Sequence, residues 1–399
     1  MTIRLAANWR VMVALMAGLL LPAAAMSAEG SLRVGVLGQR TGSNMAIGRA
    51  YDEGISLALE TINEEQGGVL GKRFEATFED SGGTPERATA ALNKLITVDG
   101  VVMTVGETQS QCALVESEMA DRYRHPLLVA EALADEVTAR NSRYVFRAGP
   151  CNTGIIQDTL MGFISENGFQ RIAMIVEETE FGRNAAPLVE GELKALGLQT
   201  LALSVTRGNR DPAAVLSALK DFKPDLTLVL HYAWDMPAFE AQIRAAGFPA
   251  PLPLLFSGPS LAGQWSNSGP MGQSGANPTL RAVRLHPSVD FTDASHKLRQ
   301  DYQRKFGKDL SDYRVRAIYD ALLIAADALR RAGSVDCERV VAALEQTRLP
   351  VASGVVQFGQ ELGSYRYHHW QPPLLIVQWQ QQQPVVVYPP KAATGNLLR

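Results

Sequence analysis

The sequence predicts an α/β protein built from two doubly wound lobes, each with a parallel sheet. Three observations support this fold class. Short apolar segments alternate with amphipathic helical segments, and two such series follow one another between Leu32 and Phe256. Strands separated by helices of about ten residues or more belong to parallel sheets with crossover helices. The chain has 399 residues and is 46% hydrophobic, which is enough to bury the cores of two domains.

The first series begins with an apolar strand at Leu32–Leu37 and a helix at Met45–Glu65. Thr84-Pro85-Glu86 combines an N-cap residue, a proline at the first helical position and an acid in the first turn, so it predicts the start of another helix. The other expected elements are strands at Phe74–Glu79, Val101–Val105, Leu127–Ala130 and Tyr144–Arg147, and a helix ending at Tyr123.

The second series repeats this alternation. Its expected helices begin at Gly154, at Gly182, after the capping pair Asp211-Pro212 and at Trp234. Its expected strands are Arg171–Val176, Thr200–Val205, Leu226–His231 and Leu252–Phe256. Two series of this kind in one chain indicate two α/β lobes.

The C-terminal third has a different order of elements. A strand-like segment at Arg281–Leu285 precedes helices at Asp293–Phe306, Tyr313–Ala332 and Asp336–Glu345, and a hairpin is expected at Leu374–Trp379 and Val385–Tyr388. Helices followed by lone strands indicate that the chain returns to each lobe in turn. Residues 391–399 are expected to form a flexible tail.

Residues 1–28 are typical of a secretory signal peptide. Arg4 and Arg10 precede an apolar run from Val11 to Leu21, and small residues follow up to Ala28. The run is shorter than the about 20 apolar residues that span a bilayer. We therefore expect cleavage of this segment and export of a free, soluble protein to the periplasm.

Charge and cysteine content argue against several functions. Without Arg4 and Arg10 the formal charge changes from −3 to −5, and the absence of a basic block argues against nucleic acid as a partner. Cys112, Cys151 and Cys337 lack the spacing of metal ligands, so we expect no metal site and no cofactor. In an oxidising compartment two of the three can form a disulfide; their spacing leaves the pairing open, and Cys112–Cys151 is our choice.

Several short motifs follow one another in the order and at the spacing of one family. They are Val34-Gly35-Val36, Thr41-Gly42, Gly67-Gly68-Val69-Leu70-Gly71-Lys72, Glu79-Asp80, Tyr144-Val145-Phe146-Arg147, Phe181-Gly182, Ala245-Ala246-Gly247 and Tyr319-Asp320-Ala321. With them the chain resembles the leucine/isoleucine/valine-type periplasmic binding proteins of ABC transporters. The resemblance extends from about Ser31 to Pro389, and the glycine run before Lys72 is its most specific part.

This resemblance implies a type I periplasmic binding protein, in which two lobes joined by three hinge crossings close on a ligand. Carried onto this chain, the crossings fall near Ala148–Cys151, Leu285–Pro287 and Ser353–Val355. Residues 29–148 and 288–352 would form lobe 1, and residues 149–287 and 353–390 would form lobe 2. Independently of the family, parallel α/β sheets bind ligands at the carboxyl ends of their strands.

The resemblance also implies which positions line the ligand site, and several of them depart from the family. In amino-acid binders a Ser after the third strand and a Thr after the fourth hold the ligand carboxylate. Here Ser110 matches the Ser, whereas Leu133 stands at the Thr position. Phe181 replaces a Tyr, and Ile47 replaces an aromatic residue near the cleft mouth. Ser260 stands where an acid pairs with the ligand ammonium.

These departures predict a ligand other than an amino acid. A buried ammonium without its carboxylate partner costs about 3–5 kcal/mol. Tyr232 matches the family's pocket tyrosine, and Trp234 follows the same strand end. We therefore expect a hydrophobic or weakly polar ligand, such as an aromatic acid, an alcohol or a lipid-like molecule. A branched-chain amino acid or an amide is the alternative.

Two acidic residues keep that alternative open. A shift of the alignment by one or two positions would make Glu131 the missing partner of an ammonium. The same shift would make Leu133, Phe181 and Ile47 packing residues. Glu107, in the stretch with Thr108, either faces the cleft or caps the helix that follows.

Enzyme functions are not favoured by the motifs. Gly35-Val36-Leu37-Gly38 is not the glycine fingerprint of a dinucleotide-binding fold. Gly258-Pro259-Ser260-Leu261-Ala262 lacks the last glycine of a nucleophile elbow. His368 and His369 are adjacent, so on a strand they would point to opposite faces, and we expect a surface or loop position without a metal.

The implied partners are a small-molecule ligand and an inner-membrane ABC permease. We expect the protein to be a monomer. A ligand sensor without a transport role has the same fold and stays an alternative. No signalling domain is recognisable in the sequence, which favours transport.

Overall fold

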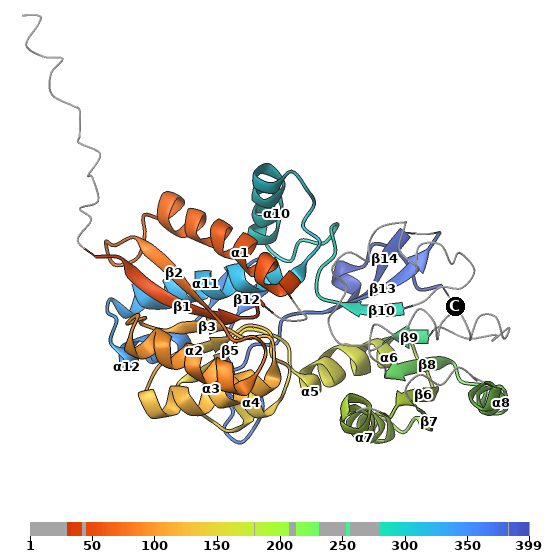
Figure 1. Ribbon diagram of the computed structural model, residues 1–399. Helices are drawn as coiled ribbons and strands as arrows, with labels where there is room; N and C mark the ends of the chain where they lie inside the picture. The colour runs from red at the N-terminus through yellow and green to blue at the C-terminus, as the bar shows by residue number, and fades with distance from the viewer. Residues whose placement is uncertain are drawn as a thin grey trace, which may run out of the picture.

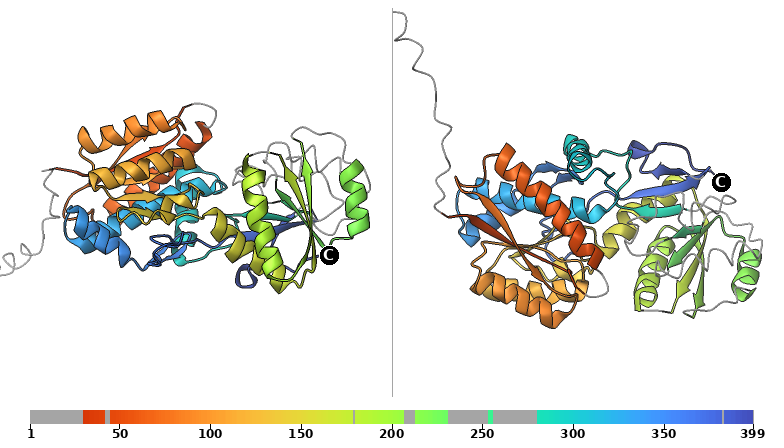
Figure 2. Two further views of the ribbon diagram at one scale, coloured as in Figure 1. Left: turned by 90° about the horizontal axis from the view of Figure 1, so that it is seen from below. Right: turned by 45° about the horizontal axis from the view of Figure 1, so that its top comes forward.

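The structure is a computed structural model that describes residues 30–41, 45–178, 180–206, 213–230, 253–255, 280–381 and 383–398. Within these residues the chain forms a five-stranded sheet, a seven-stranded sheet and a small two-stranded sheet. The two large sheets belong to two lobes that lie side by side (Figure 1), and the lobes remain distinct in the two other views (Figure 2). The predicted α/β fold class with two parallel-sheet lobes is confirmed.

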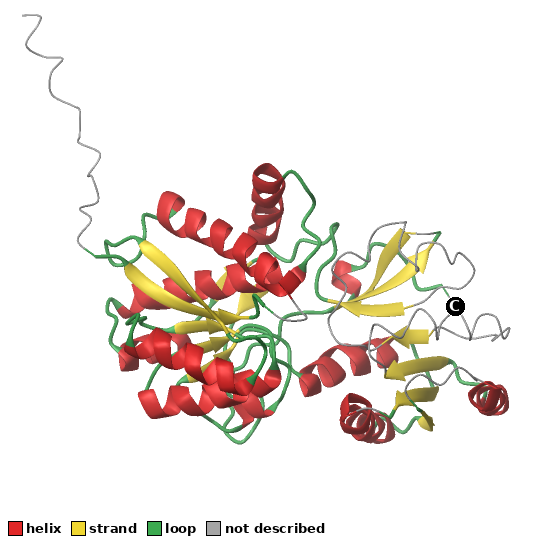
Figure 3. Ribbon diagram, in the orientation of Figure 1, coloured by secondary structure: helices red, strands yellow, loops and turns green. Residues whose placement is uncertain are grey.

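The sheet of the first lobe is parallel throughout and has the order β2-β1-β3-β4-β5. Its strands are β1 (Leu32–Gly38), β2 (Phe74–Asp80), β3 (Thr104–Gly106), β4 (Leu127–Val129) and β5 (Val145–Arg147). The helices between them are α1 (Met45–Glu60), η2 (Thr61–Glu65), α2 (Pro85–Thr97), α3 (Ser110–Tyr123) and α4 (Glu136–Ala139). Helices cover both faces of this sheet (Figure 3), so the lobe is doubly wound.

Three helices from the C-terminal third complete the first lobe. They are α10 (Asp293–Phe306), α11 (Tyr313–Ala332) and α12 (Cys337–Glu345). Apolar residues of α1, α10, α11 and α12 join those of β1 and β3 in one core, while α2 and α3 pack on the opposite face. The small sheet of β11 (Leu349–Val351) and β12 (Gly354–Val356) was not expected from the sequence.

The sheet of the second lobe has the order β14-β13-β10-β9-β8-β6-β7. Its parallel part consists of β6 (Arg171–Glu177), β7 (Gln199–Val205), β8 (Leu226–Leu230), β9 (Pro253–Leu255) and β10 (Leu280–Val283). The expected hairpin, β13 (Leu375–Gln380) and β14 (Gln383–Tyr388), adds two antiparallel strands beside β10. The described helices are α5 (Asn152–Gly154), η3 (Ile155–Met161), α6 (Gly162–Glu166), α7 (Glu180–Ala195) and α8 (Ala213–Phe222).

The chain passes between the two cores three times. The first passage follows β5, where Phe146 packs in the first core and Ile155 in the second, and another follows β10. The third lies between Trp370 in the first core and Leu374 in the second. It falls later than the expected Ser353–Val355, because Val356 and residues up to Trp370 still pack with the first lobe. That these passages act as hinges stays a prediction.

The end of the chain also differs from expectation. Residues 391–398 were expected to belong to a flexible tail, but they are bonded to the last hairpin. The short helix η4 (Pro390–Ala392) is followed by Thr394, whose N–H donates to Val386 O at 2.8 Å. The N–H of Leu398 donates to Gln378 Oε1 at 2.8 Å. A backbone bond to β14 and a bond to a side chain of β13 therefore hold this segment in place. Within the described part of the chain, no helix combines the length and apolarity needed to cross a membrane.

Candidate ligand-binding site at the carboxyl ends of the first sheet

The carboxyl ends of β3 and β4 lie side by side and are followed by Glu107 and Glu131. Gly106, at the end of β3, has φ +131°, and a Cβ there would lie 2.1 Å from the carbonyl oxygen of Leu37. Only glycine fits this close approach of β3 to β1. The N–H of Ala132 donates to Glu107 O at 3.1 Å, so the two loops continue alongside each other. Both acids are thereby placed at the sheet edge where parallel α/β folds bind ligands.

Glu107 is buried at the amino end of α3. Its Oε1 accepts hydrogen bonds from Thr108 N at 2.7 Å, Thr108 Oγ1 at 3.1 Å and Gln109 N at 3.0 Å. A carboxylate stabilises the positive end of a helix dipole and satisfies its free N–H groups. Both backbone donors, Thr108 N and Gln109 N, precede Ser110, the first residue of α3, so Glu107 holds the loop that leads into the helix, and neither of its two predicted roles is confirmed. Its Oε2 has no hydrogen-bond partner among the described residues.

Ser110 and Leu133 lie together where the first lobe meets the start of the second. The hydroxyl of Ser110 accepts a hydrogen bond from Ala134 N at 3.1 Å. Leu133 is partly buried against the core of the second lobe, and its carbonyl accepts from Asn152 N at 2.9 Å. Ser110 therefore anchors the loop after β4, and Leu133 presents an apolar side chain toward the second lobe.

Of the remaining predicted site residues, the structure describes the side chain of Ile47 but not those of Phe181, Tyr232, Trp234 and Ser260. Ile47 is 5% exposed and packs in the first core, which supports the packing role that the sequence left open. Phe181 belongs to α7, but the position of its side chain is outside what the structure describes. Tyr232, Trp234 and Ser260 lie outside the described residues, so their part in the site stays a prediction.

Glu131 is 3% exposed and faces a cation from another part of the chain. Its Oε2 lies 4.0 Å from Nη1 of Arg284, which is too far for a direct hydrogen bond. Its Oε1 has no partner among the described residues. Burial raises the pKa of Glu131, and the nearby Arg284 and Arg314 oppose that rise.

Arg284 is the first residue after β10 and is 8% exposed. Its guanidinium lies over the ring of Tyr313, with the central carbon 4.6 Å from the ring centroid. Its carbonyl accepts a short hydrogen bond from Nη2 of Arg316. The Nη2 of Arg284 itself has no hydrogen-bond partner among the described residues. The side chain is thus oriented but not fully satisfied.

Tyr51 and Arg314 complete a group that we call the buried polar cluster: Tyr51, Glu131, Arg284, Tyr313 and Arg314. The Tyr51 hydroxyl is buried, and its pKa is raised by burial, by the charges of Glu131 and Glu107 and by a hydrogen-bonding contact with Glu131. Arg314 donates from Nε to Asp312 Oδ1 at 2.8 Å. Sequence reasoning selected only Glu131 from this cluster. Arg284 could have been found by the rule that selected Tyr232, because it directly follows a strand end.

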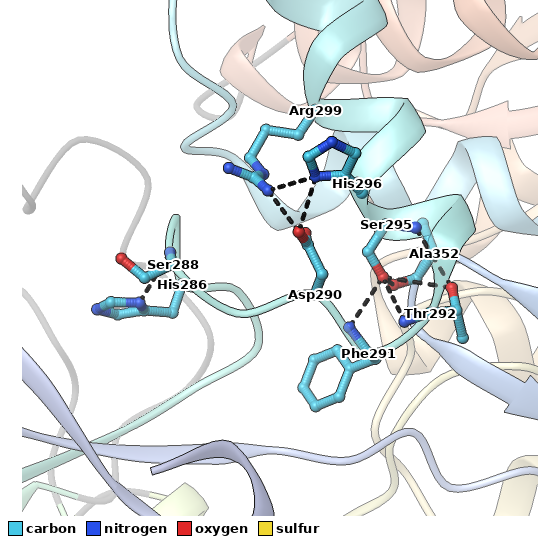
Figure 4. A network of polar contacts seen from close by, with 9 residues as sticks. All are labelled: His286, Ser288, Asp290, Phe291, Thr292, Ser295, His296, Arg299 and Ala352. Atoms are coloured by element: carbon cyan, nitrogen blue, oxygen red, sulfur yellow. Dashed lines mark hydrogen bonds and ion pairs between the residues drawn. The ribbon is translucent and has the colours of Figure 1, made fainter. Parts of the chain in front are cut away.

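The passage after β10 is attached to both lobes by a polar network (Figure 4). His286 Nδ1 accepts from Ser288 N at 3.1 Å, and its Nε2 lies 3.2 Å from Pro384 O in β14. Asp290 pairs with His296 and Arg299 of α10. These contacts fix the direction in which the chain leaves Arg284, and they hold Arg284 between the two lobes.

The first and third passages run side by side. The N–H of Arg147 donates to His368 O at 2.9 Å, and Trp370 N donates to Arg147 O at 2.9 Å. His369 lies 2.8 Å from Gly149 O through Nε2. His368 is 1% exposed and stacks on Phe146 with ring centroids 4.0 Å apart.

The two adjacent histidines lie in a loop, as one of the two expected positions had it, but they are buried and not on the surface, because they fill the space between the passages. No group of three or more metal-ligating side chains occurs within the described ranges. The predicted Cys112–Cys151 disulfide is also wrong, since all three cysteines are free. Cys112 is buried on α3, whereas Cys151 caps α5 by accepting from Gly154 N at 3.2 Å.

The fold and the location of the cluster define a two-lobed α/β protein with a polar site at a sheet edge, and comparisons with known proteins identify its family. Residues 31–384 match the family described as periplasmic binding protein. The chain belongs to this family and, within it, to the type I, leucine/isoleucine/valine-binding branch. The resemblance inferred from the sequence motifs is confirmed.

Individual relatives cover nearly the whole chain. A leucine-, isoleucine-, valine-, threonine- and alanine-binding protein of Pseudomonas aeruginosa is 25% identical over 84% of this chain and 87% of its own. A branched-chain amino acid ABC transporter periplasmic ligand-binding protein of Burkholderia xenovorans has a TM-score of 0.77 at 17% identity, covering 90% and 94% of the two chains. A solute-binding protein of Rhodopseudomonas palustris, solved with 3,4-dihydroxybenzoic acid, has a TM-score of 0.67 at 20% identity, covering 89% and 95%.

Proposed function

We propose that this protein is the exported solute-binding component of an ABC-type transport system. Its two lobes close on a small hydrophobic or weakly polar ligand, such as an aromatic acid, an alcohol or a lipid-like molecule. Membership of the periplasmic binding protein family supports the transport role. The relatives are named as binding proteins, which supports a function without catalysis and an ABC permease as the partner.

The observation that carries the ligand class is the environment of Glu131. An amino-acid ligand needs an acid for its ammonium group, and Glu131 was the candidate that the sequence left open. In the structure this acid already faces Arg284 at 4.0 Å and is influenced by Arg314. An ammonium placed there would be repelled by two guanidinium groups in a poorly solvated site. Glu131 is therefore not a free partner for an ammonium.

One of the two carboxylate anchors of an amino-acid binder is missing as well. Leu133 offers no hydroxyl, whereas the Ser110 hydroxyl accepts from Ala134 N and keeps its O–H to donate. An apolar side chain at this position suits an apolar ligand body. The structure of the Rhodopseudomonas palustris protein is an example of the same fold with an aromatic acid bound. The names of the amino-acid-binding relatives keep a branched-chain amino acid as the second candidate.

A thermal-unfolding screen of the mature protein tests this proposal. The ligand panel contains leucine, valine, benzoate, 3,4-dihydroxybenzoate, benzyl alcohol and hexanol. A ligand at 100 times its Kd raises the free energy of unfolding by about 2.7 kcal/mol. We expect this stabilisation from aromatic acids or alcohols and none from the amino acids. Stabilisation by leucine or valine alone would contradict the proposed ligand class.

The predicted aromatic residues supply a second test with whichever compound of that panel stabilises the protein. Tyr232→Ala and Trp234→Ala are each expected to weaken its binding about tenfold or more, because each removes a large apolar contact surface. Tyr123→Ala is the control, since Tyr123 is 44% exposed at the end of α3. Unchanged affinity in both cleft variants would mean that neither residue contacts the ligand.

A further inference from the structure

Within the described residues, the buried polar cluster contains one donor without a hydrogen-bond partner, Nη2 of Arg284. Arg284 is 8% exposed. The Tyr51 hydroxyl and the Glu131 carboxylate, both buried, form a hydrogen-bonding contact with each other. Buried polar groups in native proteins almost always have a partner, so the Arg284 donor requires an explanation. A ligand group that enters between the lobes supplies one.

Arg284 is oriented for such a group. It is stacked on Tyr313 at 4.6 Å, and its backbone is held by Arg316. Its position directly after β10 places it on a passage between the lobes and beside Glu131, at the sheet edge where parallel α/β folds bind ligands. A planar guanidinium presents paired N–H donors that match the two oxygens of a carboxylate.

We propose that Arg284 binds the carboxylate of the ligand, so that the protein selects small monocarboxylic acids with an apolar body. The assignment rests on the proposed function and narrows its ligand class to acids. Glu131 is the counter-charge of Arg284, and the distance of 4.0 Å between Oε2 and Nη1 shows that the two groups do not form a direct hydrogen bond. The Tyr51 hydroxyl contacts Glu131 as well.

Binding of an acid at Arg284 has a consequence for Glu131. The ligand carboxylate comes close to the Glu131 carboxylate, and two neighbouring carboxylates disfavour a second negative charge. The groups facing Glu131 are Tyr51 from α1, Arg284 after β10, and Asp312, Tyr313 and Arg314 at the start of α11. Asp312 is paired with Arg314, and both tyrosines have raised pKa values. Glu107 acts on Tyr51 and is bonded to Thr108 and Gln109.

Glu131, whose pKa is already raised by burial, is therefore the group that takes up a proton when an acid binds. The affinity for the acid is expected to fall as the pH rises between the pKa of Glu131 in the free protein and its higher pKa in the complex. Glu131→Gln is expected to abolish both the proton uptake and this pH dependence. It keeps acid binding at least as strong, because it removes the repulsion.

Calorimetric titration with matched probes tests the assignment. The probes are benzoate and hexanoate, with benzyl alcohol and hexanol as neutral partners of similar shape, and leucine. Arg284→Gln is expected to weaken binding of the acids about tenfold or more, because it removes hydrogen bonds to a charged group. Binding of the alcohols changes little. Arg143→Gln is the control for loss of one positive charge, since Arg143 forms an exposed ion pair with Glu338.

The outcomes separate this inference from the proposed function. Acids that bind more tightly than alcohols and depend on Arg284 support it. Alcohols that bind as tightly as acids, or an Arg284→Gln protein that keeps its acid affinity, would overturn it and leave the proposed function standing. The absence of binding by both acids also overturns it, and binding of leucine alone overturns the proposed function too. If Arg284→Gln does not fold, the pH profile of Glu131→Gln decides: an unchanged profile contradicts the assignment.

Discussion

At the scale of single residues, the buried atoms without partners carry most of the functional information. Leaving a buried donor or acceptor unsatisfied costs about 1–3 kcal/mol. Among the described residues, Nη2 of Arg284 is a buried donor of this kind. A ligand group that accepts a hydrogen bond from it removes that cost on binding. The cluster is thus more informative about the ligand than the apolar residues around it.

The cysteines allow a prediction at the same scale. We expect three reactive thiols per chain after denaturation and at most one, Cys337, in the native protein, because Cys112 and Cys151 are buried. Burial raises the pKa of Cys151 to about 12 and that of Cys337 to about 11, so even Cys337 reacts slowly at pH 8. Titration with an aromatic disulfide reagent checks this. A single thiol in denaturant would indicate a disulfide and contradict the structure.

Several residue assignments could be made from sequence and others could not. Thr84 was predicted to cap α2, and its hydroxyl accepts from Arg87 N at 3.4 Å. Caps are local, so the neighbouring residues are enough to predict them. Whether Glu107 faces a ligand or a helix end depends on a rotation of its side chain, which the sequence does not specify. Arg284 was overlooked because its partners come from the loop after β4 and from α11.

At the scale of elements, the packing of α1 against α11 shows why a glycine stands within α1. A Cβ at Gly54 would lie 2.4 Å from Ile318 Cγ2 and 2.5 Å from the carbonyl oxygen of Val315. The two helices therefore approach each other more closely than any side chain would allow. The sequence placed Gly54 within a helix correctly, although only the partner helix explains its identity.

A pair of substitutions tests this close approach. Gly54→Ala is expected to lower the free energy of unfolding by about 1–3 kcal/mol, because the added methyl group overpacks the interface. Gly191→Ala in α7 is the matched control, since nothing lies within 4 Å of a Cβ built there. Alanine favours the helix over glycine, so this control is expected to gain up to about 1 kcal/mol. Equal effects in urea unfolding would contradict the assigned helix contact.

The segment between β11 and β12 is held by a buried acid of α11. Asp320 accepts hydrogen bonds from Ala352 N and Ser353 N, both at 2.8 Å, and Ser295 of α10 donates to Ala352 O at 2.7 Å. These bonds hold the segment in the first lobe, which explains why the third passage lies beyond Ser353–Val355. The burial of Asp320 raises its pKa to about 6.

This raised pKa gives a dependence of stability on pH. A carboxyl group that binds protons more tightly in the folded state stabilises the protein fully below its unfolded pKa, and the contribution is lost as the pH rises through about 6. Relative to Asp320→Asn, the free energy of unfolding of the natural protein is expected to fall by up to about 3 kcal/mol between pH 3.5 and pH 7. This energy corresponds to a rise of about two pKa units. Urea unfolding of both proteins across this range measures the difference. Parallel pH profiles would show that Asp320 does not titrate in this way.

At the scale of the whole molecule, the three passages determine what the protein can do. Two lobes with separate cores and few connecting segments are suited to closure about those segments. We expect the radius of gyration to fall when a stabilising ligand from the thermal screen is added. Small-angle X-ray scattering measures this change, with a non-stabilising compound of the panel as the control. An unchanged radius under saturating ligand would argue against lobe closure.

The alternation of apolar strands and amphipathic helices was enough to predict two α/β lobes, because this periodicity depends only on residues that are close in the sequence. The order of the motifs was enough to indicate the family. The pairing of Arg284 with Glu131, the free thiols, the buried His368 and the position of the third passage were decided only by the tertiary structure. Each of them depends on which residues, far apart in the chain, come together and which do not. Such contacts depend on how the elements pack in three dimensions, which local sequence patterns do not encode.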